Sequence, residues 1–220
     1  MRVLYEDNHC IAVLKPHGML TQSDESGDPS LIEEVRAYLK ETYHKPGNVF
    51  VGLVHRLDRP AGGVVVFAKT SKGASRLSEQ FRDRRVEKIY QAVVEGHPKE
   101  TRGVVRQWIR KNEKTHEITA FEKPTIGAAE AELSYKVLET HANRSLIEIR
   151  PKTGRPHQIR LAMRSLGTPI LGDVKYGSKH PLEHRIALFA CSLTFYKPVG
   201  EEPVTVTADP DWDDLLLPSL

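Results

Sequence analysis

Short apolar runs of strand length constrain the fold of this chain more than any other feature of its sequence. The run GVVVFAK, residues 63–69, is rich in the β-branched side chains that fit a buried strand. Comparable runs begin at residues 49, 87, 185 and 203. Because these runs outnumber the helical segments and do not alternate regularly with them, the sequence predicts an α+β fold. We expect a mixed, largely antiparallel central sheet flanked by helices.

Two pairs of strands are predicted to form hairpins, because a turn signal separates the members of each pair. The first is RVLYEDNHCIAVLKP, residues 2–16, and the second is AELSYKVLETHANRSLIEIRP, residues 131–151. Three other segments have the helical spacing of apolar residues, namely 30–43, 71–85 and 155–167. In the last of these, Pro156 suits the first turn of a helix and Gly167 suits its end.

The composition is that of a folded protein. Of 220 residues, 39% are hydrophobic and 28% are charged, which is enough for one large domain or for two small lobes that share a core. The sequence contains no run of about 18 apolar residues that could span a membrane. Its N-terminus reaches acidic residues too early for a secretory signal. Cys10 and Cys191 lie in apolar runs, which predicts core packing in a reducing cytosol. We therefore expect a cytoplasmic protein, and a monomer.

The charges are unevenly distributed, although the net charge is only +3. Residues 150–175 contain six Lys and Arg against the single acid Asp173, whereas residues 201–220 contain six acids and no Lys or Arg. This asymmetry fits one face for a polyanion and another turned away from it. Two ordinary solvated surfaces would give the same pattern.

Motifs for nucleotide cofactors, serine hydrolases and metal sites are missing from the sequence. There is no G-x-G-x-x-G after a strand, no P-loop, no G-x-S-x-G and no C-x-x-C. His180 and His184 are four residues apart in HPLEH, but the Glu of H-E-x-x-H is absent. We expect the start of a surface helix there, and no cofactor or metal is implied.

Three stretches carry side chains suited to chemistry, and the first is GLVHRLDRPAGGVVVFAKT, residues 52–70. There Asp58 lies between Arg56 and Arg59, ahead of two glycines and a strand. Neighbouring guanidinium groups keep a carboxylate ionised, and an ionised, positioned Asp can act as a nucleophile. The alternative is a structural Asp–Arg pair at a turn.

The other two stretches supply an aromatic side chain and a basic cluster. In EKIYQAVVEG, Tyr90 either packs in the core or stacks its ring on a base. In the stretch from residue 151 to 177, the predicted helix start gathers Arg155, His157, Gln158 and Arg160. Backbone N–H groups and the positive end of the helix dipole suit phosphate at such a place. A merely solvated helix start is the alternative.

Together and in this order, the three stretches resemble the RluA-type family of RNA pseudouridine synthases. HRLD followed by GG and FAK is similar to the family's catalytic-Asp motif, and EKIYQAVVEG is similar to its tyrosine motif. TGRPHQIR, with LGTPILGD and VKYG, is similar to the third motif. The resemblance covers about residues 3–206. Two places depart from the pattern, because Ala61-Gly62 stand where the family usually has Thr-Ser and Pro156 stands where it usually has Thr.

The resemblance implies one pseudouridine synthase catalytic domain over residues 1–220, with a basic active-site cleft. We expect no separate N-terminal RNA-binding domain of the small kind that many relatives carry. The expected reaction is isomerisation of uridine to pseudouridine in ribosomal or transfer RNA, without a cofactor. Asp58 would be the nucleophile, or the base that starts formation of a glycal. Arg160 would pair with Asp58, and Tyr90 would stack on the uracil and assist removal of the C5 proton.

RNA is thus the expected partner, and Arg56 would fill the space that a flipped uridine leaves. The residues expected to bind RNA are His55, Arg56, Arg59, Arg155, His157 and Gln158. One alternative is a non-catalytic RNA-binding or RNA-chaperone protein of the same fold. Another is a carboxylate-dependent hydrolase, but a usual glycosidase needs two carboxylates, and the stretch around Asp58 offers one acid.

Overall fold

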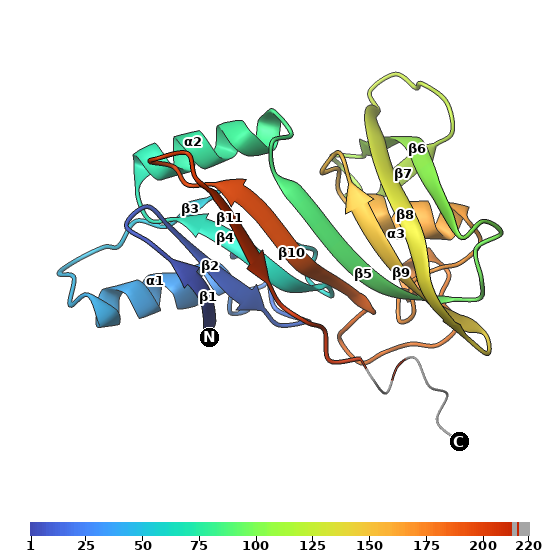
Figure 1. The fold of residues 1–220 in the computed structure, drawn as a ribbon, viewed down its shortest axis with the longest axis horizontal. Coiled ribbons are helices and arrows are strands. Elements are labelled where there is room, and N and C mark those ends of the chain that lie inside the picture. Colours follow the sequence, from blue (N-terminus) through green and yellow to red (C-terminus); the bar gives the residue numbers. More distant parts are fainter. Residues whose placement is uncertain (213–214, 216–220) are drawn as a thin grey trace. The chain divides into compact units, whose positions relative to one another are not determined.

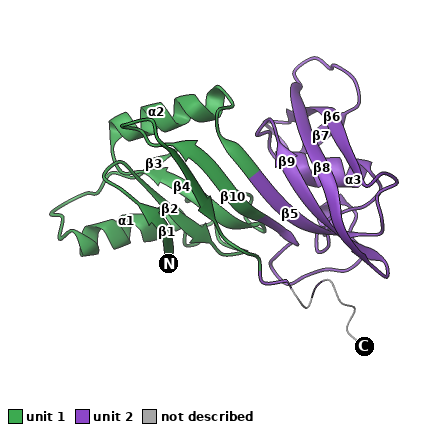
Figure 2. Ribbon diagram, in the orientation of Figure 1, with its two compact units in different colours: residues 1–88, 190–210 green, residues 89–189, 211–220 purple. Residues whose placement is uncertain are grey.

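The computed structural model describes residues 1–212 and 215 and divides the chain into two compact units. Unit 1 consists of residues 1–88 and 190–210, and unit 2 consists of residues 89–189 and 211–220 (Figure 2). Each unit contains its own part of the β-structure and its own helices (Figure 1). The chain segments that carry the three motifs fall into both units.

Unit 1 is built around the strand that the run GVVVFAK predicts. In its sheet, β1 (Arg2–Glu6), β2 (Cys10–Lys15), β4 (Gly62–Ala68) and β10 (Leu188–Tyr196) are neighbours in that order. The short β3 (Gly52–Leu53) pairs with β4, and β11 (Pro203–Thr207) pairs with β10. Every residue of β4 is buried, because it lies inside the sheet.

Two helices complete unit 1, and both follow the predicted apolar spacing. Helix α1 (Leu31–Thr42) buries Leu31, Val35 and Leu39, which recur every four residues. Helix α2 (Ser71–Arg82) begins at a Thr70 cap, whose hydroxyl oxygen accepts the N–H of Gly73. Such a cap satisfies one of the free N–H groups of the first turn.

Unit 2 is an antiparallel sheet with one covered face and one exposed face. Its strands, in spatial order, are β5 (Glu87–Glu95), β9 (Arg144–Pro151), β8 (Ala129–His141), β6 (Arg102–Lys111) and β7 (Ile118–Phe121). Helix α3 (Gln158–Ser165) and the 3-10 helix η1 (Val174–Tyr176) cover one face, where Ile109, Leu161 and Tyr176 form a buried cluster. The neighbouring β6 residues Arg106 and Arg110 are exposed, as the two-residue period of a strand requires.

The predicted α+β architecture is confirmed, as are both hairpins and all three helices. Four local predictions differ from the structure. The third helix begins only at Gln158, because His157 adopts a left-handed φ of 53°. The run at residues 49–54 is a strand only at Gly52–Leu53, and residues 180–184 form no helix. Cys10 is buried as predicted, but Cys191 is partly exposed.

Strands β6 and β7 were not predicted at all. The residues of β6 alternate between the covered face and the exposed face, and the exposed positions are mostly charged. The strand therefore lacks the continuous apolar run that identified its neighbours. No helix in the described part of the chain is long and apolar enough to cross a membrane.

The acidic segment after residue 201 is partly packed against unit 2. Trp212 is buried edge-on against Phe189, with ring centroids 6.2 Å apart, and the carbonyl of Leu215 accepts a hydrogen bond from Arg144. These two residues of the acidic segment therefore pack against the rest of unit 2. The acids Asp213 and Asp214 lie outside the described residues.

Replacing Gly63 by a residue with a Cβ is predicted to destabilise unit 1. Its φ is +121°, and a Cβ there would come 2.7 Å from Cα of Ala190. Gly63→Ala should lower the free energy of unfolding in urea by about 3 kcal/mol, from overpacking added to backbone strain. The control Gly200→Ala has a similar φ of +93° with nothing within 4 Å, so it should lose only about 1 kcal/mol. Equal losses would contradict the steric argument.

Candidate active site

Asp58 lies on the turn that connects β3 to β4 in unit 1. Its carboxylate is half-buried, whereas the flanking Arg56 and Arg59 are exposed. The N–H of Ala61 donates to the carbonyl of Asp58 at 3.0 Å and closes the turn. The sequence thus places one acid between two accessible cations, directly before a fully buried strand.

A buried amino group forms hydrogen bonds with the backbone of this turn on its buried side. Nζ of Lys15, at the end of β2, donates to the carbonyls of Ala61 at 2.7 Å, Arg59 at 3.1 Å and Pro16 at 3.0 Å. Lys15 is completely buried. Burial lowers its pKa to about 7, and the negative charge of Asp58 opposes that shift. Lys15 therefore both holds the backbone of the turn by hydrogen bonds and interacts electrostatically with the Asp58 carboxylate.

Further hydrogen bonds fix the turn on both sides of Asp58. The hydroxyl of Thr21 donates to the carbonyl of Leu57 and accepts the N–H of the same residue. Arg59 exchanges two 3.0 Å hydrogen bonds with the backbone of Gly18 and forms a 2.7 Å ion pair with Asp28. Since two of its nitrogen atoms are already engaged, Arg59 contributes to holding the turn in place.

His55 has a packing role in the structure. Its ring stacks on Phe81 with centroids 4.6 Å apart, and its Nε2 accepts the N–H of Val66 at 3.0 Å. Burial lowers the pKa of His55 to about 3, so the ring is neutral. This arrangement favours a positioning role for His55 over direct contact with RNA.

In unit 2, Arg160 is a buried cation with a buried partner. Its Nε and Nη2 each donate to one carboxylate oxygen of Asp173 at 2.7 Å. Arg160 is 6% exposed and Asp173 is 1% exposed. The guanidinium also lies 4.8 Å from the ring centroid of Tyr176. A planar guanidinium clamped in this way has a fixed direction.

The other predicted residues of this segment surround the start of α3. Gln158 is buried, and its amide bonds Thr153, the N–H of Arg155 and the carbonyl of Glu132. Nδ1 of His157 lies 2.6 Å from the hydroxyl of Tyr176. Gln158 therefore ties the loop before α3 to strand β8, and Nε of the exposed Arg155 also donates to β8, at the carbonyl of Glu130 at 3.0 Å.

Tyr90 is half-buried on β5 and pairs in register with Ile149 of β9. Ile149 pairs in turn with Tyr135, so Tyr90 lies on the same face of the sheet as those buried side chains. Asp58 belongs to unit 1, whereas Tyr90 and Arg160 belong to unit 2. The predicted pairing of Asp58 with Arg160 stays a prediction.

The sequence analysis missed the two residues that orient these charges. Lys15 is a single cation at the end of the apolar run CIAVLK, which is a signal of a buried, partnered lysine. Asp173 is the only acid among six cations in residues 150–175, but it was given no role. In the described part of the chain, no group of three or more His, Cys, Asp or Glu side chains is placed to hold a metal ion.

Comparison with known proteins decides which family this arrangement belongs to. Residues 9–165 match the family model described as RNA pseudouridylate synthase. The chain belongs to that family. This confirms the resemblance to RluA-type synthases. Asp58, Tyr90 and Arg160 all lie within the matched region, and the third motif continues beyond it to residue 177.

Individual relatives agree with the family match. The chain is 31% identical to ribosomal large subunit pseudouridine synthase C of Vibrio vulnificus, over 94% of this chain and 64% of that protein. It is also 31% identical to tRNA pseudouridine synthase C of Pasteurella multocida, over 98% and 95% of the two chains. It thus spans slightly less than two thirds of the Vibrio protein but nearly all of the Pasteurella protein.

A solved structure supports the fold of this pseudouridylate synthase family member. Human RNA pseudouridylate synthase domain containing 4 superimposes with a TM-score of 0.78 at 25% identity, covering 96% of this chain and 89% of the human chain. The α+β arrangement is therefore that of a known pseudouridylate synthase.

We predict that Lys15 makes stability depend on pH. In the unfolded chain Lys15 keeps its proton up to about pH 10.5, whereas the folded chain releases it at about 7. The unfolded state binds more protons between these values. The free energy of unfolding of the wild type should therefore rise with pH relative to Lys15→Met, by about 1 kcal/mol per pH unit. Urea unfolding at pH 7, 8 and 9 measures this, and parallel pH profiles would refute it.

We predict that Asp173→Ala destabilises the fold by about 3–5 kcal/mol, because it removes the bidentate acceptor of a buried guanidinium. Urea unfolding of the single variants and of the double variant Arg160→Met, Asp173→Leu checks this. The double variant should recover part of the loss, since neither charge then stays buried. A double variant as unstable as the sum of the single variants would show that the two side chains do not act as a pair.

Proposed function

We propose that this chain isomerises uridine to pseudouridine in RNA. One observation carries the proposal: Asp58, on a turn held by a buried lysine and flanked by accessible arginines, belongs to a chain of the pseudouridylate synthase family. A fixed carboxylate among cations suits a nucleophile that acts on an anionic polymer. An RNA-binding protein without turnover would not require such a carboxylate.

The reaction rearranges one nucleoside without net loss of atoms. The N1–C1′ bond breaks, the uracil turns, and C5 bonds to C1′; C5 loses its proton and N1 gains one. In one route the Asp58 carboxylate attacks C1′ and is later displaced, and in the other it removes a ribose proton to start a glycal. Since substrate and product are isomers, neither oxidant nor energy source enters the balance.

Arg160 and Tyr90 are proposed to complete the catalytic group. Arg160 offers five N–H donors in a fixed plane, and Asp173 engages two of its nitrogens and sets that plane. Pairing with Asp58 through the rest of the guanidinium would keep the carboxylate ionised and aimed. Tyr90 would stack on the uracil and assist removal of the C5 proton.

The RNA-binding residues divide into two groups in this proposal. Arg56 and Arg155 are exposed and reach phosphate or bases, Arg155 while its Nε donates to the carbonyl of Glu130. Arg56 fills the stack after the uridine flips out, which costs roughly a few kcal/mol. His55, Arg59, His157 and Gln158, whose side chains bond within the protein, position the surrounding loops. Some residues of the predicted set therefore contact RNA, and the others position the loops around the site.

Ribosomal or transfer RNA is the proposed substrate, because relatives of similar identity are named for one or the other. We further propose that units 1 and 2 work as one catalytic domain, that the protein acts as a monomer, and that it acts in the cytoplasm. The first of these proposals fits a chain whose three motifs are shared between the two units.

The test replaces the proposed nucleophile. Asp58→Asn should reduce pseudouridine formation by more than about 1,000-fold, while RNA affinity and unfolding free energy stay close to wild type. Mass-spectrometric mapping of RNA from cells that contain the wild type, the variant or neither protein measures the effect and identifies the site. Asp83→Asn, an exposed carboxylate at the end of α2, is the matched control. Substantial turnover by Asp58→Asn would overturn the role of Asp58.

If no site depends on the wild-type protein, and the purified protein is also inert on the same RNA, the activity itself is refuted. The RNA-binding protein without turnover then becomes the better interpretation. Release of free uracil, or cleavage of strands, would point instead to a hydrolase.

A further inference from the structure

The exposed face of the unit 2 sheet carries a hollow that the proposed reaction does not use. Register pairs Arg102 of β6 with Lys136 of β8, and Lys136 with Glu148 of β9. Residues paired in register project from the same face. Tyr90 and Ile149, one position along from these side chains, project from the opposite face, which α3 covers. The hollow is therefore on the back of unit 2 relative to Tyr90.

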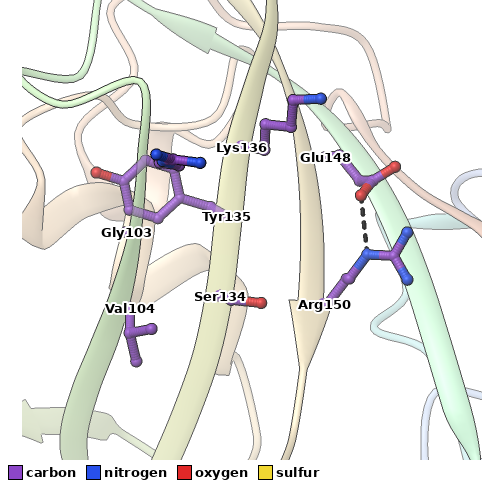
Figure 3. A pocket seen from close by; sticks show the side chains of 8 residues that line it. Gly103, Val104, Ser134, Tyr135, Lys136, Glu148 and Arg150 are labelled. Atoms are coloured by element: carbon purple, nitrogen blue, oxygen red, sulfur yellow. Dashed lines mark hydrogen bonds and ion pairs between the residues drawn. The ribbon is translucent and has the colours of Figure 1, made fainter.

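The hollow is large enough for a ligand group and is open. Its volume is about 470 Å³, and the side chains that matter for its chemistry are Arg102, Val104, Ser134, Lys136, Glu148 and Arg150. Figure 3 shows Ser134, Lys136, Glu148 and Arg150 along neighbouring strands, with Glu148 bonded to Arg150. Val104 is 62% exposed, so an apolar side chain lies beside the charges.

The charges in this hollow do not balance. Three cations face one acid, and Glu148 is already paired with Nε of Arg150 at 2.8 Å. No ion pair within 4 Å engages Arg102 or Lys136 anywhere in the described part of the chain. Lys136 has Arg102 as its direct cross-strand neighbour on one side and Glu148 on the other, and the like-charged pair of Arg102 and Lys136 is the unfavourable one. An arrangement that costs stability in the free protein is explained if an anion lies between them.

We propose that this hollow binds the phosphate backbone of a second RNA segment, distant from the uridine that reacts. The proposal rests on the proposed function, because an RNA-modifying enzyme already works in contact with a polyanion. Arg102 offers a planar fork that fits phosphate oxygens, Lys136 adds a point charge, and the Ser134 hydroxyl can donate a hydrogen bond. Val104 offers an apolar contact to the sugar between phosphates.

A second backbone contact would act by effective concentration. An RNA long enough to reach both faces of unit 2 gains affinity from the hollow, whereas a short stem-loop does not. The contact reads charge and not base sequence, so it strengthens binding without selecting the uridine. Selection of the target remains with the residues proposed for catalysis, Asp58, Arg160 and Tyr90.

The experiment measures binding without turnover. The probe is a 40-nucleotide adenosine homopolymer, which contains no uridine, and fluorescence anisotropy gives its affinity between 50 and 300 mM KCl. The double variant Arg102→Gln, Lys136→Gln should reduce the slope of log K against log salt by about 1.4, since each lost contact with single-stranded RNA removes about 0.7. Its unfolding free energy should not fall, because the opposed like charges are gone.

Two control variants sharpen the result. Arg36→Gln, Lys40→Gln removes two exposed cations from α1 of unit 1 and should leave the slope unchanged. Arg102→Lys, Lys136→Arg keeps both charges and should retain the wild-type slope. Equal slopes in all variants, or equal losses in the two Gln pairs, would overturn the proposal. Polyglutamate that binds through Arg102 and Lys136 when the RNA does not would overturn RNA as the occupant.

The outcome is independent of catalysis. Pseudouridine formation with RNA binding that ignores Arg102 and Lys136 would refute the hollow and leave the enzyme intact. Binding that depends on both cations, in a protein that modifies no uridine, would refute the activity and leave the hollow.

Discussion

The buried amino group of Lys15 is the constraint on which the Asp58 turn depends. A polar group that is completely buried must keep its hydrogen-bond partners, and the only acceptors recorded for Nζ among the described residues are three backbone carbonyls. Two of these carbonyls belong to Arg59 and Ala61, so the backbone directly after Asp58 is directed inward. On this turn Arg56 is exposed and Asp58 is half-buried, whereas Leu57 and Ala61 are buried. The position of the proposed nucleophile thus follows from the hydrogen-bonding needs of a residue that takes no part in the reaction.

The same solution recurs in unit 2, where Asp173 fixes the buried guanidinium of Arg160. A buried ion pair contributes little net stability, because removing two charges from water costs about as much as their attraction returns. The pair instead fixes the orientation of the Arg160 guanidinium, because two parallel 2.7 Å hydrogen bonds and the ring of Tyr176 hold its plane in place. In each unit, a group proposed for the chemistry is held by an ionisable residue that is buried and hydrogen-bonded. This explains why Lys15 and Asp173 are needed although neither would touch the uridine.

The sequence predicts elements with a local apolar pattern better than it predicts contacts between residues that are distant in the chain. β4 and α1 were predictable because their apolar patterns are local, and the order of three motifs was enough for the family. Strand β6 was not, because its exposed positions are charged and the pattern is hidden unless one face is known to be covered. His55 next to Arg56 suggested an RNA contact, but its partner Phe81 lies 26 positions away on α2. Contacts between distant residues, such as Lys15 with Ala61, are decided by tertiary structure and leave only a weak trace in the sequence.

The two-residue period of a strand separates two roles within unit 2. On β8, Ala131 and Leu133 are buried on the face that α3 covers, whereas Lys136 and Ser134 line the hollow. One strand therefore supports the element that carries Arg160 and also presents the cation Lys136 on the opposite side. A register slip of one residue would exchange the two faces and bury the charges. The same register that assembles the core of unit 2 thus also determines where a second segment of RNA can bind, without further structure being needed for it.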